Sequence, residues 1–253
     1  MGTVAVSSPA RPTLPANLRD VGGIRTADGF VLRDGVLYRG DAPQPGDPRS
    51  AHRLGLEPTA TWPPSAVVDL RSESETRGRR HPLADVARVH RVALGDSLAP
   101  DRVADVAASD RDLTWAYRRL AAEAGPEIAR IVGLLAREPG PLLVHCAAGK
   151  DRTGLVIGTV LAALDVPRDR IVADYLRTND VLDALWARLR ASGVPDPDHD
   201  SLFGVEAAAL EAVLDDIEAH DGGVHGFLRA AGTDPDDLRR LAERLLVPDA
   251  AIA

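Results

Sequence analysis

The sequence predicts one α/β domain, at residues 16–248, with a sheet drawn from the N-terminal two-thirds of the chain and a helical C-terminal third. Short apolar runs bounded by proline, glycine or charge, at 65–72 and 141–145, are typical of buried strands. Longer segments with apolar residues at helical spacing separate and follow them. No linker interrupts the chain after residue 16, and 253 residues, 45% of them hydrophobic, suffice for one large core.

The N-terminal part divides into an arm and the beginning of the sheet. Residues 1–15 are rich in proline and serine without apolar periodicity, which predicts a flexible arm. Apolar runs at 30–32 and 36–38 flank the tripeptide Arg-Asp-Gly, a pattern typical of a tight β-hairpin. A further strand is predicted at 87–94.

Helices are predicted between and after the strands. The chain from about 102 to 137 carries two amphipathic segments, the second of which begins at Pro126. The next segments are predicted to be a strand, a loop that contains glycine, and an apolar helix that ends before Pro167. The remaining chain is predicted to be a series of helices separated by glycine, proline and aspartate.

The composition excludes several classes of partner and site. The net charge of −8 opposes non-specific binding to nucleic acid. The chain has no run of about 18 apolar residues and no charged-then-apolar leader, so we expect neither membrane insertion nor a secretory signal. The default expectation is a cytoplasmic protein, with export by a non-classical route as the alternative. Cys146 is the only cysteine, so it forms no internal disulfide.

The stretch VHCAAGKDRTG at 144–154 contains the only cysteine and the only lysine of the chain. It lies between a predicted strand and a predicted helix, where unpaired N–H groups and the helix dipole attract anions. Gly149 permits a tight path, so we expect the loop amides from Ala147 to Arg152 to surround a phosphate. The dipole and Arg152 favour the thiolate of Cys146, which is the form that attacks phosphorus. The planar fork of Arg152 suits two phosphoryl oxygens.

Cys146, five intervening residues and Arg152 resemble the signature loop of the cysteine-dependent protein tyrosine phosphatase superfamily. The resemblance covers most of residues 17–247. Members of this superfamily carry mobile covering helices at the position of residues 102–124, so this segment is expected either to cover the loop as a helical lid or to pack in the core. The resemblance is greatest to the bacterial atypical branch, typified by mycobacterial protein tyrosine phosphatase B, and implies a central, mostly parallel twisted sheet flanked by helices. The motifs that carry it are NLRDVGG at 17–23, LYRG at 37–40, VDLRS at 68–72, GKDRTG at 149–154 and ADYLRTN at 173–179.

The resemblance implies a role for most residues of the loop. Cys146 would be the nucleophile that forms a cysteinyl-phosphate, Arg152 the transition-state clamp, and His145 a supporting residue that orients the loop. Thr153 is spaced to donate its hydroxyl to the sulfur as it leaves. The chemistry needs neither metal nor cofactor, and the histidines outside the loop show no metal-ligand spacing. The other substrate-binding positions form the phosphate cradle: Ala147, Ala148, Gly149 and Lys150.

The general acid is predicted from three carboxylates. Asp151 is the first candidate, because similar loops with aspartate directly before the arginine use it in that role. Asp69, also a supporting residue of the site, and Asp96 are the reserve candidates. The segment TWPPS at 61–65 lacks the aspartate of the mobile Trp-Pro-Asp loop found in many relatives, so it is interpreted as a turn before the next strand.

The expected substrate is a phosphorylated protein or a phosphoinositide, and free phosphate or vanadate should bind in the same loop. Lys150 adds positive charge at the rim, as in the loops of phosphoinositide phosphatases. Those lipid enzymes often carry a second lysine directly after the cysteine, where this chain has Ala147. We therefore expect phosphotyrosine to be preferred, with phosphoserine, phosphothreonine and inositide phosphates accepted more weakly.

Other functions use a cysteine or glycine loop of this kind. A nucleotide-binding P-loop is excluded, because it requires glycine where Val144 stands and serine or threonine where Asp151 stands. Rhodanese and arsenate reductase chemistry also uses a cysteine on an anion-binding loop, but arsenate reductases place it near the N-terminus and need further cysteines. A catalytically idle phospho-ligand-binding protein is the remaining alternative, since it would use the same cradle.

Overall fold

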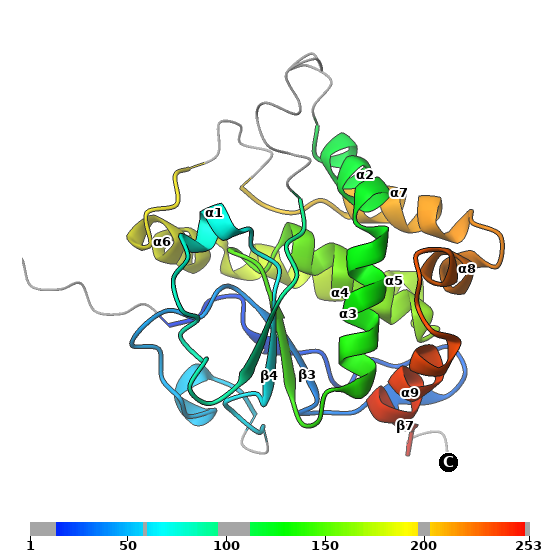
Figure 1. The fold of residues 1–253 in the computed structure, drawn as a ribbon, viewed down its shortest axis with the longest axis horizontal. Helices are drawn as coiled ribbons and strands as arrows, with labels where there is room; N and C mark the ends of the chain where they lie inside the picture. Colours follow the sequence, from blue (N-terminus) through cyan, green and yellow to red (C-terminus); the bar gives the residue numbers. More distant parts are fainter. Residues whose placement is uncertain (1–13, 58–59, 96–111, 197–202, 251–253) are drawn as a thin grey trace, which may run out of the picture.

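The central sheet of the computed structural model is mostly parallel (Figure 1). The structure describes residues 14–57, 60–95, 112–196 and 203–250. The strands of the sheet are β1 (Arg19–Asp20), β3 (Leu37–Gly40), β4 (Ala66–Asp69), β5 (Arg88–Arg91) and β6 (Leu142–His145). They lie in the order β1-β3-β6-β4-β5, with β1 antiparallel to β3 and the other neighbours parallel. The predicted α/β class and the strands predicted in this region are confirmed.

The hairpin predicted between 30–32 and 36–38 is wrong. β2 (Phe30–Leu32) instead pairs antiparallel with β7 (Leu246–Pro248), close to the end of the described chain. β3 lies inside the sheet, and β1 and β6 already occupy both of its edges. The turn at Gly35, where φ is +73°, is supported by Asp20, whose carboxylate accepts a hydrogen bond from the Gly35 N–H at 2.6 Å.

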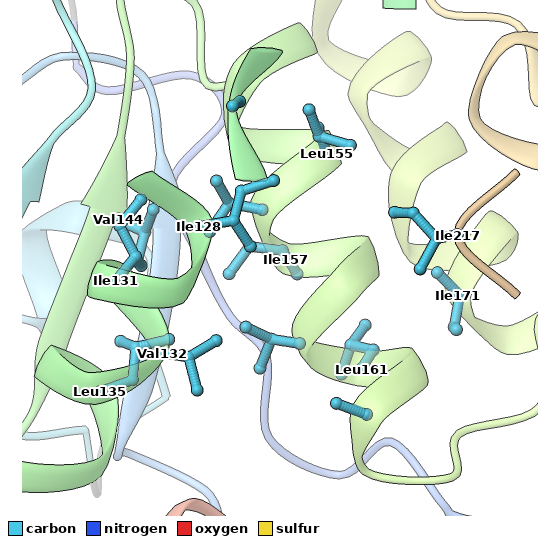
Figure 2. Packing of buried hydrophobic residues seen from close by; sticks show 14 of the residues in the cluster. Ile128, Ile131, Val132, Leu135, Val144, Leu155, Ile157, Leu161, Ile171 and Ile217 are labelled. Carbon is cyan, nitrogen blue, oxygen red and sulfur yellow. The ribbon is translucent and has the colours of Figure 1, made fainter. Parts of the chain in front are cut away.

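The two faces of the sheet bury different clusters, as the alternation of side chains along a strand requires. Val68 and Val144 face a large apolar cluster that includes α3 (Gly125–Arg137) and α4 (Asp151–Ala163). The opposite face, which includes Val67, is covered mainly by the chain between β3 and β5. Figure 2 shows members of the large cluster on the two helices: Ile128, Ile131, Val132 and Leu135 on α3, and Leu155, Ile157 and Leu161 on α4.

The C-terminal third is helical, as predicted. The remaining helices are α1 (Glu73–Thr76), α2 (Leu113–Glu123), α5 (Arg168–Leu176), α6 (Leu182–Ala191), α7 (Ala207–Glu218), α8 (Gly223–Ala230) and α9 (Pro235–Leu245), with short 3-10 helices η1 (His52–Leu54) and η5 (Arg177–Val181). α2 packs against α7, and α3 packs against α9. In the part of the chain that the structure describes, no helix combines the length and the apolar character needed to cross a membrane.

The carboxyl ends of β4 and β6 meet at one edge of the sheet, where α1 and α4 begin. β4 ends at Asp69 and β6 ends at His145, directly before Cys146. This edge is the usual place for a ligand in a parallel α/β sheet. Most of the predicted N-terminal arm, residues 1–13, lies outside the described residues, and the domain bounds 16–248 stay a prediction.

Candidate active site

The signature loop connects β6 to α4 in the strand, loop and helix order that the sequence predicts. Cys146 follows β6 directly and is buried, with 3% of its surface exposed. α4 begins at Asp151, and its first N–H groups have no preceding turn to bond, so they supply the partial positive charge that binds an anion. Gly149 has a φ of +67°, and a Cβ there would lie 2.3 Å from the carbonyl group of Gly40. Only glycine fits this turn.

Arg152 is held by a carboxylate that the sequence pattern does not indicate. Its two terminal nitrogens donate to the two carboxylate oxygens of Glu75 in α1, each at 2.6 Å. Glu75 also accepts from the backbone N–H of Ser72 at 2.9 Å, within a capping box. Although burial opposes ionisation, the hydrogen bonds and charge of Arg152 lower the pKa of Glu75. Because both carboxylate oxygens are engaged, the planar guanidinium is fixed in orientation.

His145 and His81 form a buried chain of hydrogen bonds that ends on the nucleophile's backbone. The Leu83 N–H donates to Nδ1 of His81 at 3.1 Å, so the proton of the neutral His81 ring lies on Nε2. That Nε2 donates to Nε2 of His145 at 3.1 Å, and Nδ1 of His145 donates to the Cys146 carbonyl at 2.9 Å. The contacts therefore assign one tautomer to each ring and tie His145 to the loop.

Both rings are neutral in the folded protein, and Asp69 beside them is ionised. Burial, and then the neighbouring His145, lower the pKa of His81 to about 3. Burial also lowers the pKa of His145, despite the nearby Asp69. Asp69 is fully buried and accepts two hydrogen bonds from Arg71 at 2.8 Å; although burial opposes ionisation, these bonds lower its pKa to about 2. This engagement disfavours Asp69 as a proton donor and suits its supporting role.

Asp69, His81 and His145 also meet the geometric requirement for a metal site, because their donor atoms lie within 4.8 Å of one another. The hydrogen bonds argue against that use. His81 carries a proton on the nitrogen that faces His145, and its other nitrogen accepts from Leu83, so the ring has no lone pair to give a cation. Asp69 is already paired with Arg71. We attribute the cluster to hydrogen bonding.

Asp151, the first candidate for the general acid, has a side chain that is 37% exposed. Its Oδ1 accepts a hydrogen bond from the hydroxyl of Tyr117 in α2 at 2.9 Å. Lys150 lies 3.6 Å from the same oxygen, but its ammonium is buried and donates to the carbonyl of Gly204 at 3.0 Å. The lysine thus ties the loop to the segment before α7. The reserve candidate Asp96 lies outside the described residues.

The segment TWPPS lies far from the loop along the sheet. It precedes β4 at the amino end of that strand, whereas the loop lies at the carboxyl end of the neighbouring β6. Trp62 packs edge to face on Tyr38, with 5.7 Å between the ring centroids. This position agrees with the interpretation of the segment as a turn that leads into β4.

Buried polar side chains hold the loop from the side of β3. The side-chain amide of Asn17 donates to the carbonyls of Ala148 and Gly149 at 3.0 and 3.1 Å. Arg39 in β3, which is 1% exposed, donates to the same Gly149 carbonyl at 3.1 Å. Both side chains come from motifs that carry the family resemblance, and the structure shows that they fix the backbone of the loop.

Asp174 in α5 neutralises two buried arginines behind the loop. Its carboxylate accepts from Arg19 at 2.9 Å and from Arg39 at 2.6 Å. Burial opposes its ionisation, but the charges of Arg39 and Arg19 lower its pKa. Three motifs that are distant in the sequence therefore form one support for the loop.

The chain matches a known protein family along nearly its whole length. The sequence model of the tyrosine phosphatase family matches residues 13–247. The chain belongs to the tyrosine phosphatase family. This membership confirms the resemblance predicted from the motifs, and it makes the chain a phosphatase.

Two curated relatives and one solved structure resemble the phosphatase. The first relative, "Triple specificity protein phosphatase PtpB" of Mycobacterium tuberculosis, is 33% identical over 280 residues, which cover 91% of this chain and 96% of the relative. A "Putative tyrosine-protein phosphatase" of Cupriavidus necator is 33% identical over 231 residues, covering 85% and 81%. The crystal structure of TpbA from P. aeruginosa covers 71% of this chain and 94% of its own, with a TM-score of 0.33 and 18% identity.

Proposed function

We propose that this tyrosine phosphatase hydrolyses phosphotyrosine in two steps, through a cysteinyl-phosphate on Cys146. The observation that carries the proposal is the loop itself: a buried thiol at the end of β6, the N-terminus of α4, and the guanidinium of Arg152 held by Glu75. Burial by itself would lower the pKa of Arg152, but the hydrogen bond with Glu75 and the negative charge of Cys146 outweigh it and raise that pKa. The guanidinium and a thiolate at Cys146 therefore stabilise each other.

In the first step the thiolate of Cys146 attacks phosphorus, and the bond from phosphorus to the tyrosine oxygen breaks. The loop amides and Arg152 hold the remaining phosphoryl oxygens, where negative charge is largest in the transition state. Asp151 gives its proton to the departing tyrosine oxygen, which leaves as neutral tyrosine. The products of this step are the cysteinyl-phosphate and an ionised Asp151.

In the second step water replaces the sulfur on phosphorus. Asp151 takes a proton from the attacking water, the bond from sulfur to phosphorus breaks, and inorganic phosphate leaves with Cys146 again a thiolate. The hydroxyl of Thr153 is fully buried and has no hydrogen-bond partner among the described residues. A buried hydroxyl without a partner is costly, so we assign it to the sulfur as negative charge returns there.

Substrate scope extends beyond phosphotyrosine in this proposal. The Mycobacterium relative is named a triple specificity phosphatase, and we extend acceptance of phosphoserine, phosphothreonine and phosphoinositides to this chain. Ala147 and the engagement of Lys150 with Gly204 leave little mobile positive charge for a lipid headgroup. We therefore place phosphotyrosine first, and a ratio of inositide to phosphotyrosine turnover above one would contradict that order. We also propose a cytoplasmic location, with non-classical export as the alternative.

The test of the proposed function is phosphate release from p-nitrophenyl phosphate in the presence of a metal chelator. We expect turnover that vanadate inhibits, abolition by Cys146→Ser because an alcohol is not ionised at neutral pH, and a strong reduction by Arg152→Ala. Full turnover by Cys146→Ser would refute the mechanism. Absence of turnover in the wild type, together with retained phosphate binding, would instead establish the alternative of an idle phospho-ligand-binding protein.

The role of Asp151 has its own test. Asp151→Asn is compared with the wild type on p-nitrophenyl phosphate and on an alkyl phosphate. Because the nitrophenolate leaves without help, we expect the alkyl phosphate to suffer the larger loss. An equal loss on both substrates would assign the acid role to another group.

A further inference from the structure

Two tyrosines from different helices meet at the carboxylate of Asp151. Tyr117 belongs to α2 and Tyr175 to α5, and they are 2% and 1% exposed. The Tyr117 hydroxyl lies 2.9 Å from Oδ1 of Asp151 and 2.5 Å from the Tyr175 hydroxyl. Tyr117 falls in the amphipathic segment for which the sequence allows either a lid or a core helix.

The direction of each hydrogen bond follows from the chemistry of the groups. When Asp151 is ionised, its Oδ1 can only accept, so the single proton of the Tyr117 hydroxyl is donated to that oxygen. Tyr175 must then donate to the oxygen of Tyr117. Burial and the charge of Asp151 raise the pKa of both tyrosines, so both hydroxyls remain protonated donors. The result is a chain of two hydroxyls that ends on Asp151.

This chain engages one of the two oxygens of Asp151. The Tyr117 hydroxyl donates to Oδ1, and the Lys150 ammonium approaches the same oxygen at 3.6 Å. Because Oδ1 is occupied, Oδ2 is left to carry the proton for the leaving group. The side chain is partly exposed at the first position of α4, where packing alone does not select a rotamer.

The tyrosines themselves are held firmly. Their rings pack edge to face, with 6.2 Å between centroids and 73° between planes. The Tyr175 ring also lies over Gly154, where a Cβ would approach its carbon atoms to 2.7 Å. Gly154, in the first turn of α4, therefore makes room for the aromatic ring, and this contact couples α4 to α5.

We propose that Tyr117 is a positioning residue for Asp151, and that Tyr175 orients Tyr117, so that the acid proton on Oδ2 meets the oxygen of the leaving group. The inference rests on the proposed function, because it takes Asp151 as the acid. It assigns α2 a part in the reaction through one hydroxyl, without requiring the helix to move.

The test is Tyr117→Phe, assayed on p-nitrophenyl phosphate and on an alkyl phosphate with the same preparation. A well-placed acid contributes about 10²–10⁴ in rate, and a displacement of about 1 Å costs up to about 10². We therefore expect turnover of the alkyl phosphate to fall about 10- to 100-fold, with a much smaller loss on p-nitrophenyl phosphate. The ratio of the two rates does not depend on the folded fraction, so partial unfolding of the variant cannot produce this result.

Two further variants separate positioning from a structural effect. In an Asp151→Asn background, Tyr117→Phe should add no further selective loss, because the residue it acts through is already disabled. Tyr175→Phe should show the same substrate pattern at smaller amplitude. Tyr38→Phe, at a buried tyrosine on the opposite face of the sheet, should leave the ratio unchanged.

The outcomes distinguish this inference from the proposed function. A uniform loss on both substrates in Tyr117→Phe, or a full additional selective loss in the Asp151→Asn background, would overturn the positioning role and leave the nucleophile untouched. Activity in Cys146→Ser, or an equal loss on both substrates in Asp151→Asn, would instead overturn the proposed mechanism itself.

Discussion

Removing the carboxylate of Asp174 should destabilise the protein far more than removing an exposed one. In Asp174→Ala, Arg19 and Arg39 lose their shared counter-charge in a site where the Asp174 side chain is 3% exposed. The matched control is Asp216→Ala, which breaks an ion pair with Arg118 whose side chains are 52% and 53% exposed. Both variants make the same chemical change on a helix, so the comparison isolates burial.

The expected magnitude follows from what each arginine retains. Breaking a buried pair by removing one partner costs about 3–5 kcal/mol, because a charge is left without compensation. Arg19 keeps hydrogen bonds to the Asp174 carbonyl at 2.7 Å and to the Asn17 side chain, whereas Arg39 keeps the Gly149 carbonyl. The loss is therefore that of about one buried pair and not of two. The exposed control should lose at most about 1 kcal/mol.

Urea unfolding of the wild type and both variants measures these free energies, with an unchanged slope as the condition for comparing midpoints. Vanadate inhibition of the same samples reports on the loop. Asp174→Ala should weaken it because Arg39, which donates to the Gly149 carbonyl, loses the carboxylate that fixes its guanidinium. Equal stability losses in the two variants would refute the greater cost of removing the buried carboxylate, and unchanged vanadate inhibition in Asp174→Ala would refute its support of the loop.

Glu75→Gln should lower kcat/KM on p-nitrophenyl phosphate about 10-fold, because the single amide oxygen cannot accept hydrogen bonds from both terminal nitrogens of Arg152. Unchanged kinetics would show that the carboxylate is dispensable. Gly149→Ala should abolish vanadate binding, because the added Cβ would lie 2.3 Å from the Gly40 carbonyl group. Gly193→Ala is the control and should leave vanadate binding intact, because Gly193 also has a positive φ but an added Cβ there would meet no described atom within 4 Å. Equal effects would contradict the conclusion that close packing at Gly149 requires glycine. Acid should destabilise the fold through His81 and His145, which are neutral when folded and protonate near pH 6.5 when unfolded. The unfolded chain then binds more protons, so stability should fall by about 1.4 kcal/mol per pH unit for each ring below about pH 6.5, with the His81 contribution complete near its folded pKa of about 3. Urea titrations between pH 7 and 4 measure this slope, and a flat profile would contradict the conclusion that both rings are neutral in the folded protein.

Local patterns were sufficient to predict the buried parallel strands, the loop and the long helices, but not the short β1 and α1. The runs that become β4 and β6 are apolar on both faces, and a buried parallel strand requires that. The predicted hairpin between 30–32 and 36–38 is wrong because the partner of a strand can be a segment that is distant in the sequence. The Arg-Asp-Gly turn has the right local chemistry, yet β7, more than 200 residues away in the sequence, is the partner of β2.

The loop of the candidate site was predictable from its motif, but its supports were not. Glu75 belongs to a recognisable helix start, the capping box at Ser72, and nothing local connects that start with Arg152. Tyr117 had the periodicity of a core residue, which it also is. His81 lies in none of the motifs that carry the resemblance, although its ring is buried and is hydrogen-bonded to His145. Each acts through a contact that only the folded chain creates.

The most direct test of the central claim is to identify the residue that carries phosphate during turnover. The enzyme is mixed with a radiolabelled phosphotyrosyl peptide, quenched by denaturation within one turnover, and mapped by mass spectrometry. The label should lie on Cys146 and should be absent in Cys146→Ser. Phosphate on any other residue, or full turnover by Cys146→Ser, would contradict the account.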